Sequence, residues 1–197
     1  MKDRELTEKK ILDAVGEIIV EDGFEKVGVN AVAQKAGISK MLIYRYFGSI
    51  EELITKYIFL NDFWINISSA PVGSENISVY IKKMFRKQIS QLREDITLKR
   101  LYRWELSANN LAISQLREKR EQNGCNLIKT ISNLTHSPQK EVASLASILS
   151  ASISYLVLLE ELNPTYNGIN LQSDNGWEQI AQGIDLIIDL WIQNSKQ

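Results

Sequence analysis

The sequence predicts an all-α protein of about nine helices, and three observations support that fold class. Apolar residues recur every three or four positions along most of the 197-residue chain, which is the spacing of one helix face. Residue types that begin or end helices stand at the boundaries of these periodic segments. Between turn signals there are no runs of alternating β-branched residues, so we expect no sheet.

The first two helices are expected before Gly37. Apolar residues recur at helical spacing from Thr7 onward, and the threonine hydroxyl suits an N-cap. Asp22 and Gly23 then supply a helix end. A second helix is expected over residues 29–36, and Gly37 ends it.

A third and a fourth helix follow closely. Ser39 is expected to cap a helix that continues through Phe47, and Ser49 is expected to cap the next one. Two glutamates in the first turn of the fourth helix interact favourably with its dipole. This helix is expected to continue to about Ile67.

The rest of the chain is expected to be helical with two loops. Residues 70–74 contain a proline and a glycine and predict the first loop, and residues 163–175 predict the second. Pro138 suits the first turn of a helix. The remaining helices are expected over about residues 76–93, 95–106, 109–134, 137–162 and 175–193.

Composition argues against several functional classes. The formal net charge is −1, so nucleic-acid binding would need a local patch of positive charge. One cysteine and one histidine exclude a disulfide framework and a thiolate zinc cluster, and we expect no metal or other cofactor. No phosphate-binding glycine loop or nucleophile motif appears, so we expect no enzyme. The charged N-terminus and the lack of a long uncharged apolar run predict a cytoplasmic protein that does not enter a membrane.

The strongest functional signal is a stretch without acidic residues. Residues 26–50 contain no aspartate or glutamate but four basic residues, Lys26, Lys35, Lys40 and Arg45. The stretch includes two short helices joined by a tight glycine turn, which is the arrangement of a helix-turn-helix that reads the major groove of DNA. A solvated helix hairpin without a ligand is the alternative interpretation of these residues taken alone.

Nine side chains are candidates for DNA contact. They lie at the start of the second helix, or on the third helix and its capping residue. Lysine and arginine can reach phosphate or guanine, tyrosine hydroxyls can donate to phosphate, and an apolar side chain can contact a thymine methyl group. The candidates are Val29, Asn30, Ser39, Lys40, Met41, Leu42, Tyr44, Arg45 and Tyr46.

Residues 7–54 resemble the DNA-binding domain of the TetR (tetracycline repressor) family of transcriptional regulators. Each matching segment is weak alone, but the combination at this spacing is specific and covers about a quarter of the chain. The segments are Ile11-Leu12-Asp13-Ala14, Asp22-Gly23-Phe24, Val32-Ala33, Ala36-Gly37-Ile38-Ser39-Lys40, Ile43-Tyr44-Arg45-Tyr46-Phe47 and Glu51-Glu52-Leu53.

Four positions depart from the pattern of that family. Met41 and Leu42 replace a small pair, often Gly-Thr, so a hydroxyl that could contact DNA is absent. Ile50 replaces a lysine, which removes one expected phosphate contact, and Gly28 replaces a threonine or serine that usually caps the second helix. We therefore expect DNA binding to persist with an altered sequence preference.

The resemblance implies that residues 1–52 bind DNA, and that residues 53–197 sense a ligand and form a homodimer. Aromatic side chains of the middle helices are candidates to line a pocket, with plain core packing as the alternative for each: Phe63, Trp64, Phe85, Tyr102, Trp104 and Tyr155. Small and apolar residues of the last two long helices are candidates for a four-helix dimer interface, with an intrachain core as the alternative: Ala143, Ser147, Ala151, Ser154, Ile184, Ile188 and Trp191.

Two other features are given structural interpretations. Residues 82–103 carry eight basic residues against two acidic ones, which we interpret as a solvated charged face, with an anionic-ligand site as the alternative. His136 stands beside a loop and is expected at the surface.

Together these features predict a transcriptional regulator, in the first place a repressor. It would bind a roughly palindromic double-stranded operator as a dimer and be released by an unknown small-molecule effector. The alternative is a helical protein-interaction module that does not bind DNA. In such a module the acid-free stretch would have no role.

Overall fold

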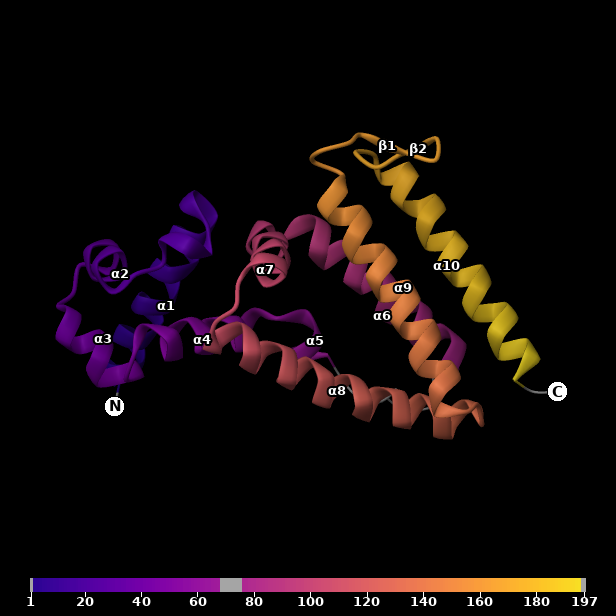
Figure 1. The fold of residues 1–197 in the computed structure, drawn as a ribbon, viewed down its shortest axis with the longest axis horizontal. Helices are drawn as coiled ribbons and strands as arrows, with labels where there is room; N and C mark the ends of the chain where they lie inside the picture. Colours follow the sequence, from indigo (N-terminus) through magenta and orange to yellow (C-terminus); the bar gives the residue numbers. More distant parts are fainter. Residues whose placement is uncertain (1, 68–75, 196–197) are drawn as a thin grey trace. The chain divides into compact units, whose positions relative to one another are not determined.

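The computed structural model describes residues 2–67 and 76–195, and it is built of helices and one short β-hairpin (Figure 1). The prediction of an all-α fold is confirmed. The predicted loop at residues 70–74 lies outside the described residues. The helices are α1 (Lys2–Asp22), the short 3-10 helix η1 (Phe24–Lys26), α2 (Val29–Ala36), α3 (Lys40–Phe47), α4 (Ile50–Asn61), α5 (Phe63–Asn66), α6 (Ile77–Glu94), α7 (Ile96–Ser107), α8 (Leu111–Thr135), α9 (Gln139–Leu159) and α10 (Asp174–Asn194).

The prediction of no sheet is wrong within residues 163–175. There β1 (Thr165–Tyr166) and β2 (Ile169–Asn170) pair in an antiparallel hairpin. The two linking residues, Asn167 and Gly168, have positive φ angles of 50° and 83°. A two-residue hairpin turn requires positive φ angles, and an Asn-Gly pair adopts them readily. Two-residue strands are too short to show alternation, whereas the Asn-Gly pair alone is a hairpin signal.

Helix boundaries differ from the predicted ones at three places. The first helix begins at Lys2 instead of Thr7, and α9 ends at Leu159 instead of near residue 162. The predicted fourth helix is interrupted at Asp62, whose backbone is extended (φ −74°, ψ 131°). The carboxylate of Asp62 accepts a hydrogen bond from the Ile65 N–H at 3.0 Å. Asp62 therefore ends α4 and caps α5, as short polar side chains at helix starts do.

The described chain forms two compact units. The first contains the residues up to 66 together with 96–120, and the second contains 67–95 together with the residues from 121 onward. The expected functional boundary after residue 52 falls inside α4, and α4 belongs entirely to the first unit. Helix α8 begins in the first unit and continues into the second.

In the first unit, α1 packs against α2, α4 and α7. Its apolar face buries Ile11 and Ile19 completely, as the helical spacing predicts. Just after α1, the ring of Phe24 stacks on Trp104 of α7, with the ring centroids 4.7 Å apart. Arg100 of α7 donates from Nη1 to the Ile19 carbonyl oxygen at 2.6 Å, close to the end of α1. Basic side chains favour this position because the last carbonyl groups of a helix lack helical partners.

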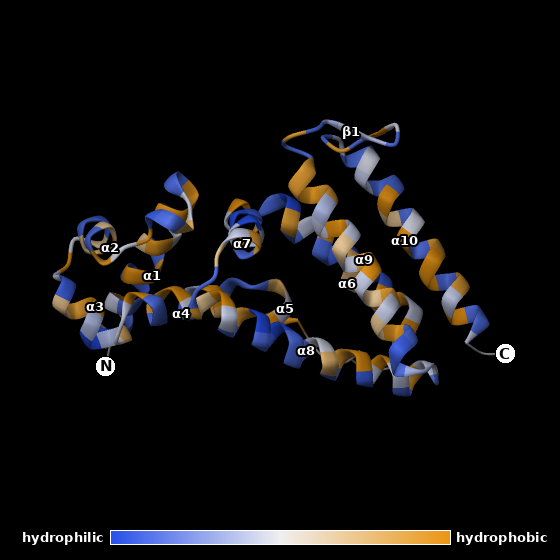
Figure 2. Ribbon diagram, viewed as in Figure 1, coloured by the Kyte–Doolittle hydropathy of each residue, from blue (hydrophilic) through white to orange (hydrophobic). Residues whose placement is uncertain are grey.

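In the second unit, α6 packs against both α9 and α10. Figure 2 shows α9 as a predominantly apolar helix. Among the described helices, it alone has the length and hydropathy needed to cross a membrane, with 22% of that stretch buried. Core helices of soluble proteins meet the same criteria, so this is weak evidence for a membrane span.

Ion pairs join α6 to α10 and to the segment before it. Lys82 lies 2.5 Å from a carboxylate oxygen of Asp189, and Arg86 contacts both Glu178 and Asp185 at 2.8 Å. Farther along α6, the guanidinium of Arg93 lies 3.0 Å from Asp174 and 3.2 Å from Glu160. The interpretation of residues 82–103 as a solvated charged face is therefore wrong for Lys82, Arg86 and Arg93. Paired with carboxylates, these three are also unsuited to hold an anionic ligand.

Acid should weaken this pairing of α6 with α10. The hydrogen bond from Arg86 lowers the pKa of Glu178 below its ordinary value of 4.5, and that from Lys82 lowers the pKa of Asp189 below 3.8. A carboxylate with a depressed pKa in the folded state contributes stability above its unfolded pKa, and loses that contribution as pH falls through the folded value. We therefore expect the midpoint temperature of thermal unfolding to decrease as the pH is lowered from about 5 to about 3.

The double variant Lys82→Met, Arg86→Met isolates this effect from other carboxylates. Without the cations, the two pKa values return toward their ordinary range. The acid-induced fall in the midpoint, followed by circular dichroism, should therefore be smaller than in the wild-type protein. Equal falls in the two proteins would show that these pairs do not contribute.

Candidate nucleic-acid interface

Helices α2 and α3 form the predicted helix-turn-helix around Gly37. Gly37 has left-handed backbone angles (φ 59°, ψ 44°), and its N–H donates to the Gln34 carbonyl oxygen at 3.2 Å. The N–H of Ile38 then donates to the Ala33 carbonyl oxygen at 3.0 Å, which completes the end of α2. A residue with a side chain would be strained at the φ angle of Gly37, so the glycine permits the tight turn.

The inward faces of the two helices anchor them on the first unit. Val32 and Ala36 of α2 are buried, as are Ile43 and Phe47 of α3. On this inward face, the ammonium group of Lys56 of α4 lies 5.1 Å from the centre of the Phe47 ring. The opposite face of α3, which carries Lys40, Met41, Tyr44 and Arg45, is exposed. That face begins at the N-terminal end of the helix, where unpaired N–H groups favour a phosphate.

The exposed face of α3 combines positive charge with large side chains. Lys40, Met41, Tyr44 and Arg45 are all exposed, with Met41 exposing 78% of its surface and Tyr44 50%. Their arrangement is that of a recognition helix, because side chains near its start and on one face can reach base edges together. This face of α3 therefore exposes two cations, a hydroxyl group and an apolar side chain together.

Other candidates on and before α3 are placed differently from the expectation. Ser39 precedes the helix in an extended conformation, but its hydroxyl makes no capping hydrogen bond, so the expected Ser39 cap is not formed. Leu42 and Tyr46 are half-buried instead of freely outward. The guanidinium of Arg4 lies 5.5 Å from the centre of the Tyr46 ring, so this tyrosine faces α1. By contrast, Ser49 caps α4 as expected and accepts from the Glu52 N–H at 3.1 Å.

The start of α2 presents the other two candidates. Asn30 is exposed and Val29 is half-buried, and both follow Gly28, which provides no side-chain cap. The N–H groups of this first turn are therefore not satisfied by a capping side chain. An exposed amide at a helix start is suited to donate to a backbone phosphate.

The basic residues of the acid-free stretch are not equivalent in space. Lys35 lies 2.6 Å from Glu21 and 3.5 Å from Glu17, and the hydrogen bond to Glu21 raises the pKa of Lys35. Lys35 is therefore a tie between α2 and α1 and not part of the free positive surface. Lys10, outside the stretch, was not among the candidates. Its Nζ lies 3.8 Å from the point where a Cβ on Gly37 would be, so it adds a cation beside the turn.

The aromatic candidates for a ligand pocket are divided between the two units. Four belong to the first unit and two, Phe85 and Tyr155, to the second. Trp104 is taken up by its stack on Phe24, and Tyr155 is exposed, with its ring edge-on to that of Tyr166 at 6.0 Å. Phe63 and Trp64 pack edge-to-face on each other at 4.9 Å, which fits the alternative of core packing.

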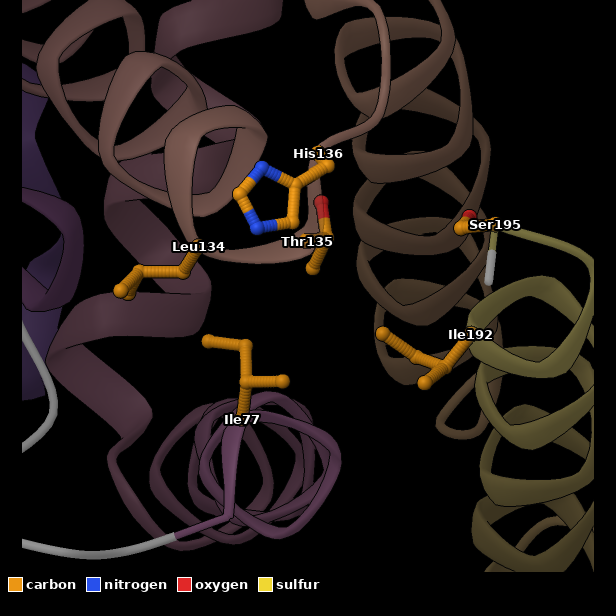
Figure 3. A pocket seen from close by; sticks show the side chains of 6 residues that line it. All are labelled: Ile77, Leu134, Thr135, His136, Ile192 and Ser195. Carbon is orange, nitrogen blue, oxygen red and sulfur yellow. The ribbon is translucent and has the colours of Figure 1, made fainter. Parts of the chain in front are cut away.

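A pocket of about 320 Å³ lies elsewhere in the second unit. Figure 3 shows its side chains arriving from the end of α8, the start of α6 and the end of α10. His136 borders it and is exposed, as predicted, with a positive φ of 57°. The lining residues are Ile77, Leu134, Thr135, His136, Ile192 and Ser195, none of them an earlier candidate.

The candidates for a dimer interface divide into exposed and buried residues. Ser147 and Ala151 of α9 are exposed, and Ala143, Ser154 and Trp191 are half-buried. Ile184 and Ile188 are buried within the chain, so their side chains are already enclosed. The exposed apolar side chains of the two helices are instead Ile148, Tyr155, Leu186, Ile187 and Leu190. The 3.6-residue period identified the apolar helices but not which of their faces is used within the chain.

Among the described residues, no cluster of three or more histidine, cysteine or acidic side chains could hold a metal ion. Cys125 is exposed, and its hydrogen bond to Glu121 raises the pKa of the thiol. A thiol with a raised pKa is a poor nucleophile near neutral pH.

Comparison with known proteins agrees with this geometry. Residues 11–56 match the model of the family described as bacterial regulatory proteins, tetR family. A fatty acid metabolism regulator protein of Bacillus subtilis is 27% identical over 121 residues, which cover 58% of this chain and 60% of the relative. The alignment therefore spans less than two thirds of that protein.

Solved structures extend the likeness of the fold to nearly the whole chain. A Clostridium perfringens protein, provisionally assigned as a fatty acid metabolism regulator, has a TM-score of 0.63 at 19% identity, covering 91% of this chain and 96% of its own. The complex of SmeT with triclosan has a TM-score of 0.65 at 14% identity, covering 90% and 91%. The matching family model thus assigns residues 11–56, which contain the helix-turn-helix, to the tetR family of bacterial regulatory proteins, and the solved structures show that nearly the whole chain shares their all-α fold.

Proposed function

We propose that this regulator is a repressor that binds a roughly palindromic operator as a homodimer and is released by a small-molecule effector. The single observation that carries the proposal is the exposed face of α3, where Lys40, Met41, Tyr44 and Arg45 share one surface at the start of a recognition helix. The other candidates, Val29, Asn30, Ser39, Leu42 and Tyr46, contribute from its borders.

The dimer follows from the geometry of DNA. A single recognition helix reads only a few base pairs, and two of them bind successive major grooves about one helical turn apart. The exposed apolar residues of α9 and α10, such as Ile148 and Leu186, form a surface whose burial in an interface would be favourable. Pairing that surface with its copy would form the four-helix interface expected from the sequence.

The effector class is proposed from the relatives. The Bacillus subtilis relative is named as a regulator of fatty acid metabolism, and the SmeT structure holds triclosan on a similar fold. We therefore propose fatty acids and their activated derivatives as the first molecules to test. An effector of this kind must bind the DNA-free conformation more tightly than the DNA-bound one, and a shift of α4 would change the separation of the recognition helices.

A protein-interaction module and an enzyme are less well supported alternatives. We propose that the protein is not an enzyme and that it works in the cytoplasm, where its DNA would be. The exposed cationic face of α3 has no purpose in a helical interaction module.

Footprinting on the DNA that flanks the protein's own gene tests the proposal. We expect protection of two half-sites about one helical turn apart, and loss of protection when the effector is added. A screen of fatty acids and their activated derivatives then tests the effector class. Failure of the protein to protect this DNA, together with failure to select any sequence from a random pool, would exclude the proposed function.

Met41 is expected to set part of the sequence preference. An exposed apolar side chain on a recognition helix gains most from a thymine methyl group in the major groove. Met41→Ala should lower the affinity for the preferred operator by about five- to tenfold, while binding to operators with cytosine at the contacted thymine changes little. Selection from a random DNA pool by both proteins measures the preference. An identical preference in the two proteins would contradict this role.

A further inference from the structure

The end of α4 is held by a buried ionic cluster that the helix-turn-helix account does not use. Asp62, the residue after α4, is completely buried. Arg120 of α8 donates from Nε to Oδ2 of Asp62 at 3.0 Å, and from Nη2 to the same oxygen. The third nitrogen of the guanidinium, Nη1, donates to Oε2 of Glu105 at the end of α7. All three residues lie in the first unit.

Arg120 is enclosed as well as paired. Its side chain is 14% exposed, and its guanidinium lies 4.5 Å from the centre of the Tyr102 ring. Arg117, one turn earlier, approaches the other oxygen of Glu105 at 3.6 Å, so two cations face two carboxylates. A buried charge whose partner is removed is strongly unfavourable, so Asp62, Glu105 and Arg120 fix one another's positions. The side chain of Arg117 is 51% exposed and is only an outer contact of Glu105.

The cluster fixes one particular helix end. Thr55, in the middle of α4, donates to Oε1 of Gln115 of α8 at 3.1 Å, and Asp62 meets Arg120 farther along the same two helices. The first part of α8 therefore lies along the second half of α4 (Figure 1). Helix α4 also packs against α1 and α3. Because α3 packs against α4, the position of α4 affects the position of the recognition helix.

We infer that Arg120 is a positioning residue for DNA binding: it holds the end of α4 through Asp62 and thereby sets the position of α3. The inference rests on the proposed function, because it concerns the affinity for an operator. Since α8 continues without a break to Thr135, a rotation of this helix would carry the guanidinium away from Asp62. Arg120 is therefore also a side chain through which a movement of α8 would reach the end of α4.

The test uses the full-length protein and an operator that the wild-type protein selects from a random DNA pool. Arg120→Met removes the guanidinium, and Asp62→Asn removes the carboxylate charge while retaining an oxygen that can cap α5. Each should raise the operator Kd about tenfold. The double variant should lose much less than the product of the two losses, because each substitution removes the same contact. Arg120→Lys keeps the positive charge but not the several donors of the planar guanidinium, so its operator Kd should lie between those of the wild type and Arg120→Met.

Two controls separate positioning from simple loss of stability. Arg117→Met alters the same helix without a contact to α4, and Ile113→Val weakens the buried core of α8 without touching the cluster. Both should change the operator Kd by less than about twofold at a temperature where all variants remain folded. Hydrogen exchange of residues 59–66 should rise in Arg120→Met but not in either control. This readout does not depend on DNA.

The outcomes are distinct. If the wild-type protein selects DNA but Arg120→Met binds it within about twofold, or if Ile113→Val loses as much affinity, the inference is wrong while the proposed function stands. Independent, multiplicative losses in the double variant would also overturn it. If the wild-type protein selects no DNA, the proposed function fails and the inference fails with it.

Discussion

Arg45→Ala should weaken operator binding by about 5- to 150-fold, the largest loss expected from any single side chain of the recognition helix. Arg45 is exposed on α3, and its planar guanidinium can form two hydrogen bonds at once to a phosphate or to a guanine edge. Tyr44→Phe should cause a smaller loss, because it removes only one hydroxyl. Titration of labelled operator with the purified variants measures both.

The salt dependence of operator binding distinguishes a phosphate contact of Arg45 from a guanine contact. If Arg45 binds a phosphate, Arg45→Ala should reduce the salt dependence of binding by about one counterion per subunit. If Arg45 binds a guanine, the substitution should leave the salt dependence unchanged and relax the base preference at one position of each half-site. Lys129→Ala is a matched control, because Lys129 is an exposed cation on α8 in the second unit. Unchanged affinity in both Arg45→Ala and Tyr44→Phe would count against α3 as the recognition helix.

Trp104→Ala should destabilise the first unit by about 3–5 kcal/mol. The indole of Trp104 is buried and stacks on Phe24, so its removal leaves a large cavity between α7 and the residues that follow α1. The hydrogen bond from Arg100 to the Ile19 carbonyl oxygen depends on the same packing of α7 on α1. Urea denaturation followed by circular dichroism measures the loss of unfolding free energy.

Leu106→Ala serves as the control for that substitution. Leu106 lies two residues farther along α7 and is 80% exposed, so its removal should change the free energy of unfolding by less than about 0.5 kcal/mol. A loss below about 1 kcal/mol for Trp104→Ala would mean that the stack on Phe24 does not hold α7 to α1.

Local sequence signals predicted the helix-turn-helix well. Gly37 and the apolar spacing around Ile43 describe a turn and a buried face that depend only on nearby residues. The hairpin at Asn167 escaped prediction because each strand has two residues, too few for a period to appear. The break at Asp62 escaped because the apolar period continues across it, while its carboxylate finds partners 3 and 58 residues away.

Features that depend on distant pairing could not be predicted from composition. The basic residues of α6 looked like a solvated face, but the acidic residues that pair with Lys82 and Arg86 lie about a hundred positions later, on α10. The sequence places Lys35 in the acid-free stretch, but in the structure Lys35 forms an ion pair with Glu21 of α1. For the same reason, spacing alone could not decide whether Ile184 and Ile188 belong to an intrachain core or to a partner.

The salt dependence of binding to DNA upstream of the protein's own gene tests the central claim most directly. If α3 reads the major groove while cations such as Lys10 and Lys40 bind phosphates, the logarithm of the affinity should fall linearly with the logarithm of salt concentration. The slope should be about 0.9 for each phosphate neutralised, summed over both subunits. Saturable binding with a slope of several units is the predicted result. Binding that is absent, or that does not change with salt, would contradict the account.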